Sequence, residues 1–383
     1  MTTRVRFGLI GLGMMGRELA SAVARWVHLL DPGTSPEIVA VCDPDPARRA
    51  WFEGRIVAAD SIYEDHRQLL ERTDIDVVYV AVPHHLHERV YVDVLDAGKH
   101  LFGEKPFGID AAANRAIVDA AARHPDLLVR SSSEFPFYPG ARRVVDAALS
   151  GRLGRIFEVR AGLSHSSDLD PRKPINWKRV AALNGEYGCM GDLGLHVLHI
   201  PMRLGWDVAS VYAQLTNLVP VRPDIHGDPT PSDTWDNAIL ACWSTQGFPM
   251  LFEMKRIAPG EGNTWWIEVH GDRGSVRFST KHPKQVWSLA FEPGGPQSWQ
   301  VTDIGYEGAY PAITAAIFEF GFGDAVQQML AAFCDELVHG ERMRGDMRCA
   351  TLAETTRHHA ILSAALRSER SGRAEPPGHD ASP

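Results

Sequence analysis

Three glycines, Gly11, Gly13 and Gly16, follow an apolar run at residues 5–10 and open a segment with helical periodicity. In this context Gly11 allows a tight turn, Gly13 lets the backbone approach a pyrophosphate, and Gly16 lets helix and strand pack closely. The amides that begin such a helix face a bound phosphate. The alternative is a glycine-rich turn without a ligand. The residues that we expect at the phosphates are Gly11, Gly13, Met14, Met15 and Gly16.

Asp43 ends the second apolar run, residues 38–42. A carboxylate at this place accepts hydrogen bonds from the ribose hydroxyls of NAD and repels the additional phosphate of NADP. Arg48 and Arg49 keep NADP open, because guanidinium groups bind such a phosphate; otherwise they lie on the solvated face of the next helix. We therefore predict NAD, with NADP as the less favoured cofactor.

A carboxylate and two imidazoles, Asp192, His196 and His199, have the spacing i, i+4, i+7 and share one face of a predicted helix. A carboxylate one turn before an imidazole fixes its tautomer and stabilises its charged form. Oxidation of a secondary alcohol needs a base of this kind, and histidine titrates in the right range. The alternative is that Asp192 caps the helix and both histidines are partly buried polar residues.

Lys105 follows a predicted strand at residues 99–103, and the loop 83–87 follows another at residues 75–82. Ligands of open α/β sheets bind beyond the carboxyl ends of the strands. An ammonium group held there can polarise a reacting oxygen, although a lysine on a surface turn is the alternative. The residues that we expect at the cofactor from these loops are Pro83, His84, His87, Glu104 and Lys105.

Several histidines, His84, His85 and His87 in one loop and His196 with His199, raise the question of a metal. No HExxH pattern and no cysteine pair accompanies them, and hydride transfer from a nicotinamide needs no metal. We predict no catalytic metal.

Strand-like runs alternate with helical segments over residues 1–134, which predicts a Rossmann domain with a parallel sheet. Residues 135–349 are mostly β-rich segments separated by turns, which predicts an α+β domain with a large, mostly antiparallel sheet. We expect the helical segment 350–367 to pack back on the first domain. The Pro-, Gly- and Ser-rich residues 368–383 are predicted to be disordered.

Composition narrows the class of protein. The 383 residues are 44% hydrophobic and 23% charged, with a net charge of −9, as in a soluble globular protein. The absence of a basic block argues against nucleic acid as a partner, and the apolar runs are too short for a membrane span. Five scattered cysteines without a CxxC pair, and no signal-like leader, favour the cytoplasm.

Together these motifs resemble one family. They are GLGMMG at 11–16, AVPHHLH at 81–87, GEKPFG at 103–108, GRLG at 151–154 and GDLGLHVLH at 191–199. In this order they are similar to the Gfo/Idh/MocA oxidoreductases, which include glucose–fructose oxidoreductase and inositol dehydrogenase. The resemblance covers nearly the whole chain. It implies a dinucleotide-binding domain, an open-faced sheet domain often used for oligomerisation, and a substrate cleft between them.

The resemblance also implies roles for individual residues. Lys105 corresponds to the EKP lysine that reaches the nicotinamide ribose and the substrate hydroxyl, and Asp192 and His196 to the catalytic aspartate and histidine. The chain departs from the pattern at His199, where many members carry aspartate. Cys189 and Met190 also stand where small residues are common. These departures concern the identity of the substrate.

We expect a small polyhydroxylated substrate, because aromatic rings stack on the CH faces of sugars and cyclitols while polar groups bind the hydroxyls. Packing aromatics and solvated charges are the alternative. The expected substrate residues are Trp177, Lys178, Tyr187, His199 and Trp235. The predicted protein is an NAD(P)-dependent oxidoreductase that interconverts a secondary hydroxyl and a ketone, and the resemblance implies a homodimer or homotetramer. A double-bond or imine reductase and a non-catalytic dinucleotide-binding regulator remain as alternatives.

Overall fold

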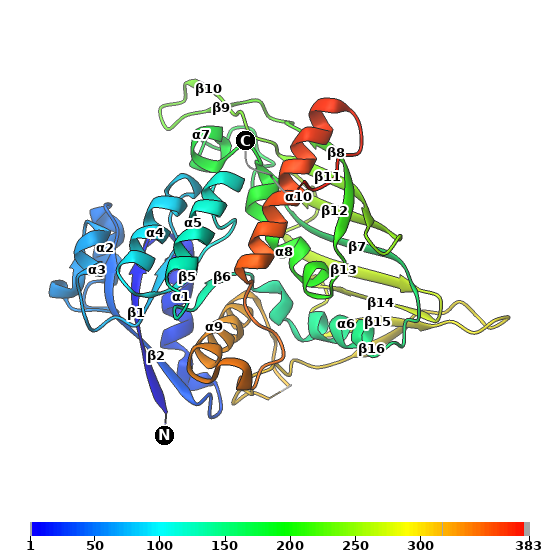
Figure 1. The fold of residues 1–383 in the computed structure, drawn as a ribbon, viewed down its shortest axis with the longest axis horizontal. Coiled ribbons are helices and arrows are strands. Elements are labelled where there is room, and N and C mark those ends of the chain that lie inside the picture. The colour runs from blue at the N-terminus through cyan, green and yellow to red at the C-terminus, as the bar shows by residue number, and fades with distance from the viewer. Residues whose placement is uncertain (1, 316, 379–383) are drawn as a thin grey trace. The chain divides into compact units, whose positions relative to one another are not determined.

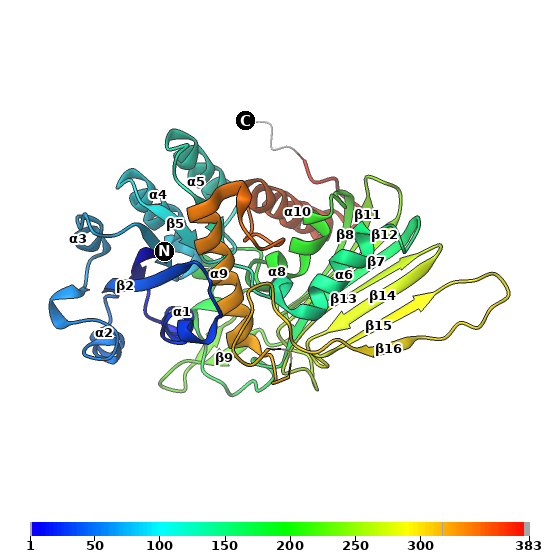
Figure 2. The same cartoon turned by 90° about the horizontal axis from the view of Figure 1, so that it is seen from below.

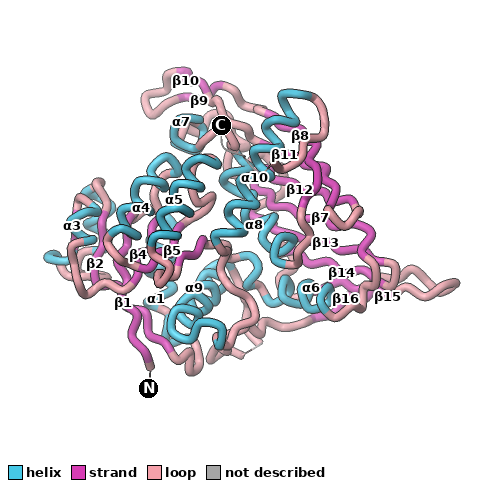
Figure 3. Tube along the Cα trace, in the orientation of Figure 1, coloured by secondary structure: helices cyan, strands magenta, loops and turns pink. Residues whose placement is uncertain are grey.

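The computed structural model describes residues 2–315 and 317–378, and the chain forms two compact units (Figures 1 and 3). The first unit contains the chain up to Phe137 together with Glu307–Leu352. The second contains Tyr138–Tyr306 and the chain from Ala353 onward. The predicted pair of folds, a Rossmann unit and a unit built on a mostly antiparallel sheet, is confirmed.

The first unit is built on a parallel sheet with the strand order β3-β2-β1-β4-β5-β6. Its strands are β1 (Thr3–Ile10), β2 (Thr34–Cys42), β3 (Ile62–Tyr63), β4 (Val77–Val80), β5 (His100–Gly103) and β6 (Val129–Ser131). Its helices are α1 (Met14–Ala24), α2 (Pro46–Phe52), α3 (His66–Leu70), α4 (His87–Asp96), α5 (Ala111–Arg123) and α9 (Phe322–His339). This order is the one expected of a dinucleotide-binding sheet.

Alternation along β1 explains why helices cover both faces of this sheet. Phe7 points to one face, where its ring lies 6.2 Å from that of Phe333 in α9. Gly8 points to the other face, where a Cβ atom would lie 2.9 Å from the Leu69 side chain of α3. Helices α1 and α9 accordingly pack side by side on one face, and α4 and α5 on the other (Figure 2).

Helix α9 corrects the expected domain boundary, because residues 135–349 were all assigned to the second domain. Within the first unit the ring of Phe333 stacks 4.5 Å from that of Phe102 in β5. Arg25 pairs with Asp324 at 2.5 Å, and Arg130 pairs with Glu336 at 2.6 Å. These contacts place the segment Glu307–Leu352 with the Rossmann sheet.

The second unit is built on an eight-stranded sheet with the order β16-β15-β14-β13-β7-β12-β11-β8. Only β12 and β7 are paired in parallel among these strands. They are β7 (Ile156–His165), β8 (Val208–Thr216), β11 (Asn237–Ser244), β12 (Pro249–Lys255), β13 (Asn263–Gly271), β14 (Gly274–Ser279), β15 (Gln285–Ala290) and β16 (Gln300–Asp303). A small hairpin adds β9 (Val221–Pro223) and β10 (Pro229–Pro231).

Helices lie on one face of this sheet, and the opposite face is open (Figure 2). The helices of the unit are α6 (Pro139–Leu149), α7 (Ala181–Asn184), α8 (Cys189–Arg203) and α10 (Leu352–Ser371). Helix α8 packs on β12, β7 and β11, and α6 packs on β14 and β13. Large apolar side chains on the sheet and its edge strands remain exposed: Phe157 (47%), Tyr212 (42%), Trp243 (55%) and Val301 (53%).

The C-terminal segment differs from both expectations for it. Helix α10 was expected on the Rossmann domain, but Glu354 near its start binds Arg203 of α8 at 2.6 Å, within the second unit. The segment 368–383 was expected to be disordered, but the backbone of Glu375 pairs with Val211 of the edge strand β8 in both directions at 2.8 Å. Residues 379–383 lie outside the described part. Within that part no helix combines the length and apolarity that crossing a membrane requires.

Candidate functional site

The carboxyl ends of β1, β4 and β5 lie next to one another in the first unit. Ile10 is in register with Val80, and Val80 with Gly103. The glycine loop, the loop 81–86 and the loop 104–108 therefore begin at the same edge of the sheet, and this is where parallel α/β sheets bind dinucleotides.

The three glycines of the loop have different surroundings. A Cβ atom on Gly11, whose φ is +93°, would overlap the carbonyl oxygen of Ala81, and one on Gly16 would overlap that of Gly11. A Cβ atom on Gly13 would meet no heavy atom of the described chain within 4 Å. Gly11 and Gly16 are thus required by backbone packing, whereas Gly13 leaves open space at the N-terminus of α1, where a pyrophosphate would fit.

Asp43 fastens the glycine loop to the end of β2. The residue is 3% exposed, one of its oxygens accepts from the Leu12 amide at 2.8 Å, and the other accepts from the Asp45 amide at 2.9 Å. Arg48 lies 3.5 Å from Asp43 and 3.3 Å from Asp45. A carboxylate oxygen accepts more than one hydrogen bond, so Asp43 retains capacity for ribose hydroxyls, while Arg48 is occupied by acidic partners.

His87 joins two of the loops at this edge. Its Nε2 donates to the Val82 carbonyl at 3.1 Å, and its Nδ1 accepts from the Gly108 amide at 3.4 Å. These roles follow because a carbonyl only accepts and an amide only donates, and they describe a neutral imidazole. The ring is 0% exposed and stacks on Tyr91. His87, which we expect at the cofactor, is a buried residue that also connects the loop after β4 to the loop of Lys105.

The lysine loop is fixed from several directions. Glu104 is 6% exposed; one of its carboxylate oxygens accepts from the Tyr79 hydroxyl at 2.6 Å, and its carbonyl accepts from Tyr91 at 2.6 Å. Lys105, which follows, is partly exposed. Burial and the Glu104 carboxylate raise the pKa of Glu134 to about 7. A second carboxyl group that the sequence did not single out therefore acts electrostatically on this loop. His84 is buried nearby, with its ring 5.3 Å from that of His87.

In the second unit, helix α8 carries Asp192 and His196, which are 2% and 4% exposed. The helix begins after Gly188, whose φ is +57°, and the Cys189 amide donates to the Trp235 carbonyl at 3.0 Å. The Trp265 indole donates to the His196 carbonyl at 2.9 Å and holds the middle of the helix on β13. The predicted helix and the shared turn of Asp192 and His196 are thus present.

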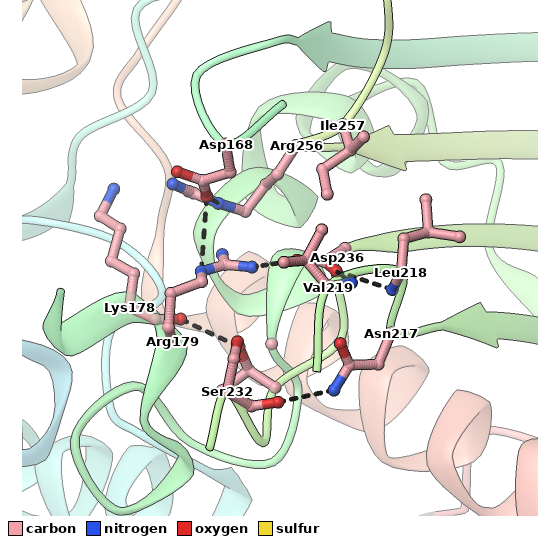
Figure 4. Close-up of polar contacts among 12 residues, drawn as sticks. Asp168, Lys178, Arg179, Asn217, Leu218, Val219, Ser232, Asp236, Arg256 and Ile257 are labelled. Carbon is pink, nitrogen blue, oxygen red and sulfur yellow. Dashed lines mark hydrogen bonds and ion pairs between the residues drawn. The ribbon is translucent and has the colours of Figure 1, made fainter. Parts of the chain in front are cut away.

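Both oxygens of Asp192 bind cations. Oδ1 accepts from Lys178 Nζ at 2.7 Å, and Oδ2 is paired with Arg256. Lys178 belongs to the short helix η5 (Trp177–Arg179), and its side chain points away from that of Arg179 (Figure 4). Asp192 and Lys178, predicted as a catalytic and a substrate residue, are thus ion-paired with each other, and Arg256 was not predicted from the sequence.

Nothing in the sequence indicated a role for Arg256, because two basic residues such as Lys255 and Arg256 at the end of a strand are typical of a solvent-exposed surface. In the structure β12 ends at Lys255, and Arg256 is 4% exposed and also pairs with Asp168 at 2.7 Å. Only tertiary structure brings residues 168, 192 and 256 together.

The other predicted substrate residues have different surroundings. Trp177 and Trp235 are partly exposed, and the Trp177 ring centroid lies 5.6 Å from Lys178 Nζ. Tyr187 is buried, and its hydroxyl contacts that of Ser363 at 2.8 Å.

His199, also expected at the substrate, is 0% exposed, and its Nε2 accepts from Arg203 at 3.0 Å inside the second unit. Its contact with substrate stays a prediction.

No group of three or more His, Cys, Asp or Glu side chains in the described part of the chain is arranged to hold a metal ion. Cys189, at the start of α8, is fully buried, and burial raises the pKa of its thiol to about 12. The thiol therefore remains protonated at neutral pH.

Comparison with known proteins adds independent evidence. Residues 5–131 match the family described as "Oxidoreductase family, NAD-binding Rossmann fold", and residues 141–277 match the "GFO/IDH/MocA C-terminal domain". Levoglucosan dehydrogenase from Pseudarthrobacter phenanthrenivorans is 26% identical over 71% of this chain and 73% of its own length. Inositol 2-dehydrogenase from Rhizobium meliloti is 26% identical over 74% and 78%.

Solved structures agree in fold. A levoglucosan dehydrogenase in complex with NADH and L-sorbose has a TM-score of 0.87 at 22% identity, covering 98% of this chain and 100% of the other. An inositol dehydrogenase homolog from Azotobacter vinelandii complexed with NAD+ has a TM-score of 0.84 at 21% identity, covering 98% and 97%. The two family matches together span more than half of the chain, and this chain belongs to the Gfo/Idh/MocA oxidoreductase family, with an NAD-binding Rossmann fold in its first unit.

Proposed function

We propose that this protein is an NAD-dependent dehydrogenase that interconverts a secondary hydroxyl and a ketone on a sugar, cyclitol or sugar-derived substrate. The observation that carries the proposal is the organisation of α8, where Asp192 is held in a cluster of charges one turn before His196, in a chain that belongs to an NAD-binding oxidoreductase family. The substrate class is supported by the relatives, which are named for levoglucosan and inositol.

The residues at the carboxyl edge of the first sheet fit a nicotinamide dinucleotide. The open space at Gly13 and the N-terminus of α1 would hold the pyrophosphate, and Asp43 would accept from the ribose. Arg48 is engaged by Asp43 and Asp45, which favours NAD over NADP. When bound, the nicotinamide supplies the acceptor or donor of the hydride.

We assign the proton transfer of the reaction and the stabilisation of its developing charge to three side chains. His196 takes the hydroxyl proton on an imidazole nitrogen during oxidation and returns it during reduction. Lys105 donates a hydrogen bond to a substrate oxygen and stabilises negative charge that develops there. Asp192 orients the proton-transfer residue one turn away and holds Lys178 by an ion pair.

The test is an assay of NADH formation with NAD+ and a panel of sugars and inositols, including levoglucosan and myo-inositol. We expect turnover with at least one polyol and a higher kcat/KM with NAD+ than with NADP+. Tight NADH binding without turnover of any polyol would indicate a dinucleotide-binding regulator instead. NADH oxidation with enones or imines alone would indicate a double-bond or imine reductase.

We further propose that the protein is a cytoplasmic homodimer or homotetramer. The helix-free face of the second sheet exposes Trp243, and all five cysteines are free and buried, as suits a reducing compartment. Light scattering of the wild type and of Trp243→Glu checks the assembly. We expect a dimer or tetramer that dissociates in the variant, and a monomeric wild type would contradict it.

A further inference from the structure

A line of alternating charges runs through the interior of the second unit, and Figure 4 shows its part from Arg256 through Asp168 and Arg179 to Asp236. Its members, in order of contact, are Lys178, Asp192, Arg256, Asp168, Arg179 and Asp236. All except Lys178 are at most 4% exposed. The line ends on the backbone, where the second oxygen of Asp236 accepts from the amides of Leu218 and Val219 at 2.8 and 3.1 Å.

Arg256 occupies the central place in this line because it bridges two carboxylates. One terminal nitrogen of its guanidinium pairs with Asp192, and its Nε donates to Asp168 at 2.7 Å. Its backbone amide and that of Ile257 both donate to the Asn237 side chain at 3.1 Å. A rigid guanidinium fork anchored at its own backbone fixes the directions of both bonds, which a lysine ammonium cannot do.

Asp168 keeps Arg256 in this orientation. Burial alone would raise the pKa of the Asp168 carboxyl, but Arg256 and Arg179 outweigh burial and hold that pKa well below its usual range. Lys173 adds a contact at 3.1 Å. Asp168 is therefore a permanent anion, and Arg256 is held between two negative groups.

The exposed end of the line is Lys178, whose side chain is 28% accessible. Lys178 and Arg256 share Asp192, one at each oxygen, so the position of Arg256 determines where the carboxylate lies. The position of the carboxylate in turn determines where the Lys178 ammonium is presented.

We propose that Arg256, supported by Asp168, is a positioning residue that acts on the reaction through Asp192. The inference rests on the proposed function, because it assumes that Asp192 serves substrate turnover. A positioning role differs from a purely structural ion pair in one measurable respect. The effect of losing Arg256 on kcat/KM depends on the carboxylate at position 192.

The experiment is a double-mutant cycle on kcat/KM, using the polyol with the highest wild-type turnover among levoglucosan, myo-inositol and sorbitol. We expect Arg256→Met to lower kcat/KM by roughly 10–100-fold. In the Asp192→Asn background the same substitution is expected to change kcat/KM by less than about threefold. Arg256→Lys, which keeps the charge but loses the fork, should lie between wild type and Arg256→Met.

Arg179 provides the matched control. It is 1% exposed and binds Asp168 and Asp236, one carboxylate further along the line from Asp192. Arg179→Lys and Arg256→Lys are expected to lower the melting temperature similarly, while Arg179→Lys changes kcat/KM by the same factor in the wild-type and in the Asp192→Asn background. The dissociation constant for NADH, measured by fluorescence, should be unchanged in every folded variant.

Two results would overturn the inference. One is that Arg256→Lys and Arg256→Met change kcat/KM by the same factor in the wild-type and in the Asp192→Asn background. The other is wild-type kcat/KM in folded Arg256→Met. Full activity of Asp192→Asn itself would instead contradict the proposed role of Asp192 in turnover, so the two failures are distinguishable.

Discussion

At the scale of single residues, the proposed reaction depends on one ammonium and one imidazole. Lys105 follows β5, and His196 lies in the middle of α8. We expect Lys105→Ala and His196→Ala each to lower kcat by roughly 10²–10⁴-fold, because the first removes a group that stabilises developing charge and the second removes the group that transfers the proton. The dissociation constant for NADH should stay within about threefold, because the glycine loop is intact in both.

Lys99→Ala is the control for the lysine. Lys99 is also partly exposed and lies in the same unit, where its ammonium donates to the Arg72 carbonyl at 2.8 Å. It should retain wild-type kcat. Stopped-flow or steady-state assays of the three variants suffice, and wild-type turnover in Lys105→Ala or His196→Ala would remove the mechanism.

The elements that carry the proposed catalytic residues were predictable where they depend on neighbours in the sequence. The i, i+4 spacing of Asp192 and His196 and the lysine after a strand follow from local pattern, and both elements are present. The partner of Asp192 was not predictable, because Arg256 lies 64 residues away and approaches only through the pairing of β12 with β7. His199 shared the predicted face, but pattern cannot show that Arg203 and Glu354 enclose it.

At the scale of elements, the glycine that backbone packing requires in the turn between β1 and α1 is not the glycine that leaves space for a ligand. Gly13→Ala is expected to fold with wild-type stability, because φ at this residue is −71° and its Cβ atom would meet nothing in the described chain. Its NADH dissociation constant should rise at least roughly tenfold, since the methyl group occupies the space at the phosphates.

Gly16→Ala should behave in the opposite way. Its Cβ atom would overlap the carbonyl oxygen of Gly11, so backbone atoms must shift. We expect the free energy of unfolding to fall by roughly 1–3 kcal/mol. Urea unfolding and NADH fluorescence titration of the two variants provide the comparison. A stable Gly16→Ala together with unchanged NADH affinity in Gly13→Ala would contradict this account of the loop.

Elements were easier to predict than their partners. The strands after which the glycine and lysine loops begin, and both long C-terminal helices, are present. Helical periodicity identifies an apolar face but not the sheet that this face covers. Phe333 of α9 packs against the Rossmann sheet, and Glu354 of α10 binds α8, the reverse of the expected domain assignment. The β-pairing of Glu375 with Val211 could not be predicted for a similar reason. The composition of the C-terminal segment is typical of disorder and does not show that an edge strand is available to pair with it.

At the scale of the whole molecule, a buried neutral histidine links stability to pH. Nε2 of His199 accepts from Arg203, and a guanidinium can only donate, so the proton of this ring is on Nδ1. Burial, followed by the charge of Arg203, lowers the pKa of His199 to about 3. In the unfolded chain the same imidazole titrates near 6.5. Below that value the unfolded state therefore binds more protons than the folded state, and stability is lost as the pH falls.

This difference predicts that His199 alone costs the second unit roughly 2 kcal/mol of unfolding free energy between pH 7 and pH 5. His165, whose pKa burial and Arg256 lower to about 4, adds to the same acid loss. The contribution of His199 is isolated by His199→Gln, whose amide oxygen can still accept from Arg203 but does not titrate. Urea unfolding at pH 7 and pH 5 should show that the variant loses less unfolding free energy than the wild type, by the roughly 2 kcal/mol that one titrating proton contributes. If the unfolding free energy depends on pH equally in the two proteins, the imidazole titrates normally in the folded state. Protons from solvent would then reach the ring of this residue on α8.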